Sequence, residues 1–232
     1  MDEIMKPIMH VTNCKRLNLP FICELDYPSA HIMFPNAVDG DAMLKRLERI
    51  ARVAYKTEEY IKEGSDRVLL NKILKSGHES VIEHESVTVI WKVDRSMSHE
   101  IVRHRIAAYT QESQRYCNYN KKGYEVIVPL YLRDKKSSPE YNEWQSAVLS
   151  VITRYQQWVD SGVKPEQARA VLPNCMATTL VSTMNLREWR HFFQLRAIDT
   201  SSNHPYPPIK EVSSNLLEEF KAKIPLIFDD IA

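Results

Sequence analysis

Residues 103–116 read RHRIAAYTQESQRY, a stretch in which three consecutive basic side chains precede a serine and a further arginine. Arg103, His104 and Arg105 come first, and Ser113 and Arg115 follow after seven intervening residues. The chain has only five glycines, which are too dispersed to form a G-x-G-x-x-G or P-loop motif. A phosphate group would therefore have to be held by arginine, serine and helix N-termini.

The composition around this stretch is that of a soluble globular protein. The 232 residues are 44% apolar and 26% charged, and the net charge of +1 argues against a general nucleic-acid binder. No apolar run approaches the ~20 residues that span a membrane, and the N-terminus lacks a signal-peptide pattern. The four cysteines show no C-x-x-C pairing. We therefore expect reduced thiols, a cytoplasmic location, no membrane contact and no metal site.

The hydrophobic pattern predicts alternating helices and strands on both sides of the basic stretch. The expected helices cover residues 41–62, 65–76, 96–105, 138–159, 166–171, 186–197 and 212–222. The expected strands cover residues 86–93, 125–130 and 177–184. Residues 1–38 contain four prolines and are expected to form an irregular N-terminal segment. Without repeats or a linker, residues 1–232 are predicted to form one α+β domain.

The basic stretch allows three interpretations. It could be a solvated helix face, or a nucleic-acid-binding strip, although the near-neutral net charge weakens that alternative. It could also bind anionic ligands. Because neighbours on a helix point about 100° apart, the RHR side chains would then serve two ligands or two subunits. Ser113 and Arg115 could close on one phosphate. The nucleic-acid-binding strip would comprise Arg95, Arg103, Arg105 and Arg115.

Two further features carry candidate chemistry. In KSGHESVIEHES (75–86) the two histidines are six residues apart, which does not suit a zinc helix. Either Glu83 pairs with His84, or His78 and Ser80 reach a cofactor pocket. Cys175 could attack a uracil ring, but it has no evident activating partner, which favours a buried, unreactive thiol.

The stretch RHRIAAYTQESQRY contains the RHR-x7-S signature of the flavin-dependent thymidylate synthases, and the chain resembles that family. The segments ARVAYKTE (51–58), GHESVIEH (77–84), SGVKPEQARAVLP (161–173) and TMNLREWRHFFQLR (183–196) resemble its other landmarks in the same order. The resemblance implies a single-domain α+β fold with a mixed sheet packed with helices, assembled as a homotetramer. It also implies methylation of dUMP to dTMP, with methylenetetrahydrofolate as carbon donor and NADPH-reduced FAD as hydride donor.

The resemblance assigns roles by position. Arg196 is implied to lie against the uracil, and His78 near the reacting flavin and folate, as the catalytic residues. The implied cofactor contacts are Ser80, Arg103, His104, Arg105, Gln111, Asn185, Arg187 and His191. The implied contacts to dUMP are Glu100, Arg103, Gln111, Glu112, Ser113, Gln114, Arg115, Arg169 and Arg196.

The expected chemistry suits these residue types. Arginine supplies bidentate donors to a monophosphate dianion. A fixed cation such as Arg196 at the ring carbonyls would stabilise negative charge that develops on uracil. Glu100 departs from the pattern, since it stands where the family often has glutamine near the nucleotide. The segment 198–211 departs from it as well, because it adds length and includes Pro207 and Pro208.

Overall fold

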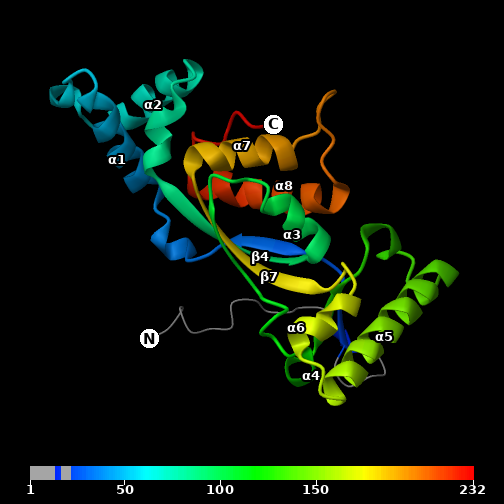
Figure 1. Ribbon diagram of the computed structural model, residues 1–232. Coiled ribbons are helices and arrows are strands. Elements are labelled where there is room, and N and C mark those ends of the chain that lie inside the picture. The colour runs from blue at the N-terminus through cyan, green and yellow to red at the C-terminus, as the bar shows by residue number, and fades with distance from the viewer. Residues whose placement is uncertain (1–13, 17–21) are drawn as a thin grey trace. The chain divides into compact units, whose positions relative to one another are not determined.

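The computed structural model describes residues 14–16 and 22–232 of the chain (Figure 1). It divides into two compact units, each built from three separate stretches. The first unit comprises the described residues up to Ser29, Trp91–Ile101 and Thr110–Leu180. The second comprises Ala30–Ile90, Val102–Tyr109 and Val181–Ala232. The mixed α+β character is confirmed, while the single domain over 1–232 stays a prediction.

The first unit contains a small mixed sheet with strand order β1-β2-β6. Strand β2 pairs antiparallel with β1 and parallel with β6, with Leu25 opposite Ile127. Its elements are β1 (Cys14–Arg16), β2 (Ile22–Leu25), α3 (Arg95–Ile101), α4 (Tyr119–Lys122), β6 (Tyr124–Ile127), α5 (Pro139–Asp160), α6 (Pro165–Ala168), and 3₁₀ turns at Leu130–Leu132 and Arg169–Val171.

The second unit is mainly helical, and α7 packs against α8 within it (Figure 1). Its elements are α1 (Gly40–Val53), α2 (Ser65–Lys75), the 3₁₀ helix η3 (Glu79–His84), α7 (Leu186–Arg196), α8 (Pro207–Lys223), and 3₁₀ turns at Pro35–Ala37 and Glu58–Tyr60. A further sheet has the order β3-β4-β7-β5, and all four of its strands contain residues of both units. These strands are β3 (Ser29–Ile32), β4 (Ser86–Asp94), β5 (Ala108–Gln111) and β7 (Ala177–Asn185).

Each unit has its own aromatic core. In the first, the rings of Tyr119, Tyr124 and Tyr155 lie 6.0–6.1 Å apart, and α5 adds the helically spaced apolar face that its sequence predicts. In the second, Phe220 lies 5.0 Å from Trp189 and packs edge-to-face with further phenylalanines of α7 and the C-terminal segment. Such contacts add to the stabilisation from burying large apolar surface.

Helix starts follow local chemistry. Asp39 caps α1 by accepting a hydrogen bond from the Ala42 N–H, and Ser138 caps α5 in the same way. Gly40, the first residue of α1, meets the end of α8 so closely that a Cβ would lie 2.2 Å from the carbonyl oxygen of Lys223. Only glycine fits at this approach.

Several sequence expectations need correction. Among the described residues of 1–38, three short strands replace the expected irregular structure, and the remainder of that segment lies outside the description. Helix α1 ends at Val53 instead of continuing to residue 62, so Tyr55 is 79% exposed. In α2 the buried apolar residue is Leu70, whereas the apolar Val68 is 74% exposed. Helix α8 begins five residues before the predicted start at 212.

The remaining long elements agree with the prediction to within a few residues. Strands β4 and β7 and helices α2, α5 and α7 all occur where their periodicity placed them. No helix in the described part of the chain combines the length and the apolar character needed to cross a bilayer.

Candidate functional site

The RHR triplet lies just after helix α3, which ends at Ile101. Arg103 is in a turn, and His104 and Arg105 follow without regular secondary structure, so the prediction of a helix through residue 105 is wrong. Both arginines are exposed, whereas His104 is only 5% exposed. The side chains of Arg103, His104 and Arg105 therefore differ in exposure, as expected, but the cause is the turn after α3 and not helical spacing.

His104 is enclosed by side chains of α7. The Nε of Arg196 donates a hydrogen bond to Nε2 of His104 over 3.2 Å, and a Glu188 oxygen lies 3.3 Å from Nδ1. The Phe192 ring packs at a centroid distance of 4.8 Å, and the His191 ring at 5.8 Å. The Glu188 contact has the length but not the direction of a hydrogen bond, so Nδ1 is a buried polar atom without a partner among the described residues.

The charge state of this cluster follows from its burial. Burial, followed by the nearby positive charge of Arg196 and then by His191 and Arg103, lowers the pKa of His104 to about 4. The ring is therefore neutral near pH 7, and its contact with Glu188 is not an ion pair. Burial also raises the pKa of the Glu188 carboxyl.

A pocket of about 490 Å³ lies over the polar side of α7 in the second unit, and we call it the α7 pocket. It includes three predicted cofactor residues, Asn185, Arg187 and His191, together with residues that the sequence did not single out. The complete lining is Glu79, Glu83, Ile106, Asn185, Arg187, Glu188, His191 and Gln194.

Arg187 provides the exposed positive charge of the α7 pocket. Its Nη1 donates to Glu83 over 2.5 Å, and its Nε lies 3.7 Å from Glu79. The Glu83 carboxylate therefore pairs with Arg187 and not with His84, as one interpretation of the sequence had suggested. Asn185 caps α7 by accepting from the Glu188 N–H over 2.8 Å, which leaves the donor end of its amide for other partners.

The other two predicted residues of this region flank Glu79. His78 precedes η3 and Ser80 lies within it, and both are exposed. Neither lines the α7 pocket. Glu79 itself is held from outside the pocket, since Arg190 donates to it from Nε over 3.1 Å.

Arg190 is a buried cation that connects three segments. Besides Glu79, it binds the Asp230 carboxylate through both Nη atoms, at 2.6 and 2.7 Å, and the carbonyl of Ile227. Its side chain is 5% exposed, compared with 50% for Arg187. Arg190 lies within the motif segment 183–196, but nothing in the sequence indicates its three partners.

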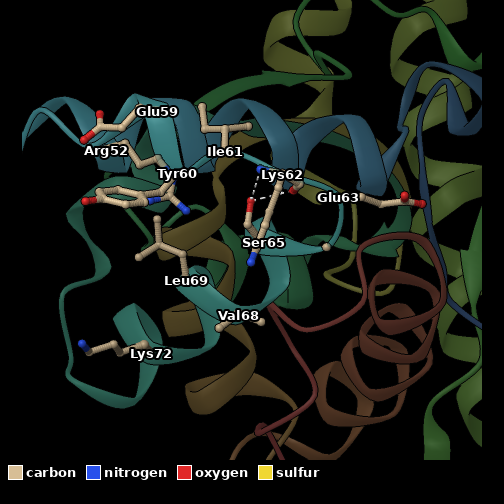
Figure 2. A pocket seen from close by; sticks show the side chains of 11 residues that line it. Arg52, Glu59, Tyr60, Ile61, Lys62, Glu63, Ser65, Val68, Leu69 and Lys72 are labelled. Carbon is tan, nitrogen blue, oxygen red and sulfur yellow. Dashed lines mark hydrogen bonds between the residues drawn. The ribbon is translucent and has the colours of Figure 1, made fainter.

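A second hollow of about 560 Å³ lies between the 58–65 connection and α2 (Figure 2). Figure 2 shows the Tyr60 ring beside Leu69, and the Ser65 hydroxyl bonded to the backbone of Lys62. The charged residues that line this hollow are of both signs, and none of the predicted site residues is among them. We assign no ligand to it.

In the first unit, the predicted phosphate residues surround a carboxylate. Arg115 donates from Nε to Glu166 over 2.9 Å, and its N–H donates to the Ser113 hydroxyl over 3.2 Å. The hydrogen bond and charge of Arg115, then the charges of Lys164 and Arg169, lower the pKa of Glu166. The structure thus shows Arg115 in contact with both Glu166 and Ser113, while Arg169 acts on Glu166 through its charge.

The rest of the predicted nucleotide residues in this unit are more varied. Glu112 accepts a hydrogen bond from the Tyr119 hydroxyl over 2.8 Å, and Gln111 donates to Thr178 over 3.4 Å. Both side chains thus have partners inside the unit. Glu100 on α3 and Gln114 in the following loop are half-buried.

The cysteines do not supply a nucleophile. Burial raises the pKa of the Cys175 thiol to about 11, which disfavours the thiolate and supports the interpretation of an unreactive residue. Cys23 is disulfide-bonded, so the expectation of reduced thiols throughout is wrong.

Known structures identify the class of fold. Two crystal structures of a UMP/dUMP methylase, PolB from Streptomyces cacaoi, superpose with TM-scores of 0.73 and 0.72. One is bound with 5-Br dUMP and the other with 5-Br UMP. They are 22% and 23% identical and cover 89% and 90% of this chain, and 95% and 96% of their own. This chain therefore has the α+β fold of these structures.

Sequence comparison identifies the family. Residues 40–226 match the family model described as thymidylate synthase complementing protein, and the chain belongs to this family. Relatives named flavin-dependent thymidylate synthase include those of Pyrococcus abyssi, 38% identical over 69% of this chain, and Corynebacterium efficiens, 31% identical over 90%. The matches cover 65% and 86% of those relatives. The chain thus spans slightly less than two thirds of the length of the Pyrococcus relative. The resemblance stated from the motifs is confirmed.

Proposed function

We propose that the protein methylates dUMP to dTMP, with methylenetetrahydrofolate as carbon donor and NADPH-reduced FAD as hydride donor. Its family membership supports this activity, as do the names of its relatives and the uridylate analogues bound to PolB. The observation that carries the proposal is Arg115, which contacts Ser113 and Glu166, together with Arg169, whose charge acts on the same carboxyl. These residues supply hydrogen-bond donors and two arginines suited to a monophosphate.

In this proposal Ser113, Arg115 and Arg169 bind the dUMP phosphate. Arg196 lies against the uracil ring and stabilises the negative charge that develops there. The further contacts to the nucleotide are Glu100, Arg103, Gln111, Glu112 and Gln114. His78 is proposed to lie beside the reacting groups, where it can orient them.

The donor set of the α7 pocket fits a flavin dinucleotide. Its volume lies within the range of small-molecule sites, and Asn185, Arg187 and His191 offer an amide, a cation and an imidazole. We propose that they bind FAD together with Ser80, Arg103, His104, Arg105 and Gln111. When bound, the flavin supplies the hydride chemistry, and these side chains hold and orient it.

The proposed assembly is a cytoplasmic homotetramer of single-domain chains, with FAD at subunit interfaces. The exposure of His78, Ser80, Arg103 and Arg105 in the single chain supports this arrangement. Side chains that bind a cofactor are largely enclosed in the working site, and a neighbouring subunit would enclose these four.

An anaerobic assay tests the function. The purified protein should carry flavin absorbance, and NADPH oxidation should produce dTMP only when dUMP and methylenetetrahydrofolate are both present. A colourless protein that gains no flavin on titration contradicts the proposal. Salt-sensitive retention on a nucleic-acid column without any effect of nucleotides would favour the nucleic-acid alternative. Full turnover by Cys175→Ala would exclude attack by that thiol.

A further inference from the structure

We propose that Glu188 and His104 are positioning residues that hold the Arg196 guanidinium, with Glu188 selecting the His104 tautomer that can accept a hydrogen bond from Arg196. This inference rests on the proposed role of Arg196 at the uracil ring. All three side chains belong to the second unit, and both contacts are direct.

The contact between Arg196 and His104 determines where the imidazole proton lies. A guanidinium has donors and no acceptor, so Nε2 of His104 must present a lone pair. A neutral imidazole carries one N–H, which must then be on Nδ1. Nδ1 is the atom that faces Glu188 at 3.3 Å. The Glu188 carboxyl is not aligned for a hydrogen bond with Nδ1, so it favours a proton on that atom through its proximity and polarity alone, and this is the tautomer that Arg196 requires.

The ring has little freedom to turn over and reverse this arrangement. Phe192 packs on it at 4.8 Å, and the Tyr109 hydroxyl donates to the His104 carbonyl over 2.7 Å, which fixes the backbone. The ring is also buried, so water does not compete for either nitrogen. The arrangement of Glu188, His104 and Arg196 is therefore built into the fold.

A neutral acceptor has a functional consequence for Arg196. A carboxylate in the place of the His104 imidazole would oppose the charge of the guanidinium, whereas a neutral imidazole orients the guanidinium without adding an opposing charge. A substrate ring that gains negative charge is stabilised by a cation that is fixed in place. The carboxylate of Glu188 lies one imidazole further away, where its opposing effect on the substrate is smaller.

The first experiment is a nitrogen-15 NMR measurement on holoenzyme labelled in histidine. We expect His104 to show a protonated Nδ1 and an unprotonated Nε2 between pH 6 and 8. Glu188→Leu should shift the signals toward a tautomer mixture. Glu83→Gln, which alters another carboxylate of the α7 pocket, should leave the His104 signals unchanged. A protonated Nε2 in the unsubstituted protein would overturn the proposal.

The second experiment compares variants by turnover. His104→Leu should lower kcat at least tenfold with dUMP affinity changed less than threefold. His104→Gln should recover a large part of the loss, because its side-chain oxygen can accept from Arg196. Equal kcat for His104→Leu and the unsubstituted protein would refute the positioning role. So would equal losses in the Leu and Gln variants when both retain flavin and thermal stability.

The two tests separate this inference from the proposed function. A protein with the Nδ1–H tautomer that turns over no dUMP would contradict the function alone. A protein that makes dTMP but shows the opposite tautomer would contradict the positioning role alone.

Discussion

Arg115 donates a hydrogen bond from its Nε to the Oε2 oxygen of Glu166, and the two atoms are 2.9 Å apart. In the proposed function this carboxylate competes with the dUMP phosphate for the same guanidinium. Glu166→Gln keeps an oxygen acceptor but removes the opposing charge. Because both side chains of this pair are exposed to solvent, their attraction is weak, and dUMP affinity should rise by no more than about fivefold. Equilibrium titration of both proteins with dUMP measures this difference.

The matched control for that titration is Glu140→Gln, which neutralises an exposed carboxylate in the first turn of α5. It should leave dUMP affinity unchanged. Weaker binding by Glu166→Gln would mean that the carboxylate organises Arg115 for the phosphate instead of competing with it.

Ser113→Ala should weaken dUMP binding about tenfold while turnover at saturating dUMP persists. The hydroxyl is proposed to donate to a phosphate oxygen, and a hydrogen bond to a charged group is worth about 1.5–3 kcal/mol. Steady-state kinetics over a range of dUMP concentrations separates KM from kcat. Ser137→Ala, at an exposed serine of the same unit, is the control. Loss of all chemistry with unchanged dUMP affinity would contradict a binding role.

Two arginines of α7 that share Glu79 should differ sharply in their contribution to stability. Arg190→Met removes a buried cation from Asp230, Glu79 and the Ile227 carbonyl, and should lower the free energy of unfolding by about 3 kcal/mol. Arg187→Met removes a half-exposed cation and should cost far less. Denaturant unfolding of the two variants checks this, and equal losses would show that burial does not set the difference.

Gly40→Ala should destabilise the protein by about 2 kcal/mol, since the new Cβ would be 2.2 Å from the Lys223 carbonyl oxygen and the two helices would have to separate. Thermal unfolding measures the loss. Lys45→Ala, on the exposed side of the same helix, should change stability by less than about 0.5 kcal/mol. A Gly40→Ala protein as stable as its parent would rule out this close approach.

The lowered pKa of His104 leads us to expect that stability depends on pH. Its pKa is lowered to about 4, whereas an unfolded histidine has the ordinary value of 6.5. Between these values the unfolded chain binds a proton that the folded chain does not, so stability falls as the pH drops from 6.5 toward 4. Over the whole of this pH range the free energy of unfolding should fall by about 3 kcal/mol. The charged and titratable groups that face the ring are Arg103, Tyr109, Glu188, His191 and Arg196.

This contribution can be isolated with His104→Gln, which has no titrating group at that position. The stability difference between the parent and the variant should shrink as the pH falls through this window. A difference that stays constant from pH 7 to pH 4.5 would show that His104 titrates normally.

Elements with regular apolar spacing could be predicted closely from the sequence. Strand β4 alternates buried valines with more exposed residues, and α5 repeats its apolar side chains at helical spacing. These patterns depend on neighbours in the chain, and so they are visible in one sequence. Helix ends were less predictable: α1 stops at Val53 instead of residue 62 and α8 begins at Pro207 instead of residue 212, whereas the ends that meet at Gly40 and Lys223 were predicted to within one residue.

The predicted site residues were identified by motif, but their partners were not. The Arg196–His104 bond joins residues 92 positions apart, and the Arg190–Glu79 bond joins residues 111 apart. Composition and spacing carry no information about such pairings. The burial of His104 was not predicted for the same reason. Three consecutive polar residues such as RHR are typical of a surface segment.

The segment around Asp230 connects the packing of the second unit to the α7 pocket. Asp230 and the Ile227 carbonyl hold Arg190, while Phe228 and Ile231 are buried. Loss of the Asp230 carboxylate would remove the counter-ion of a cation that also binds Glu79, a residue that lines the α7 pocket. A substitution at Asp230 should therefore reduce cofactor retention even though this residue does not line the pocket.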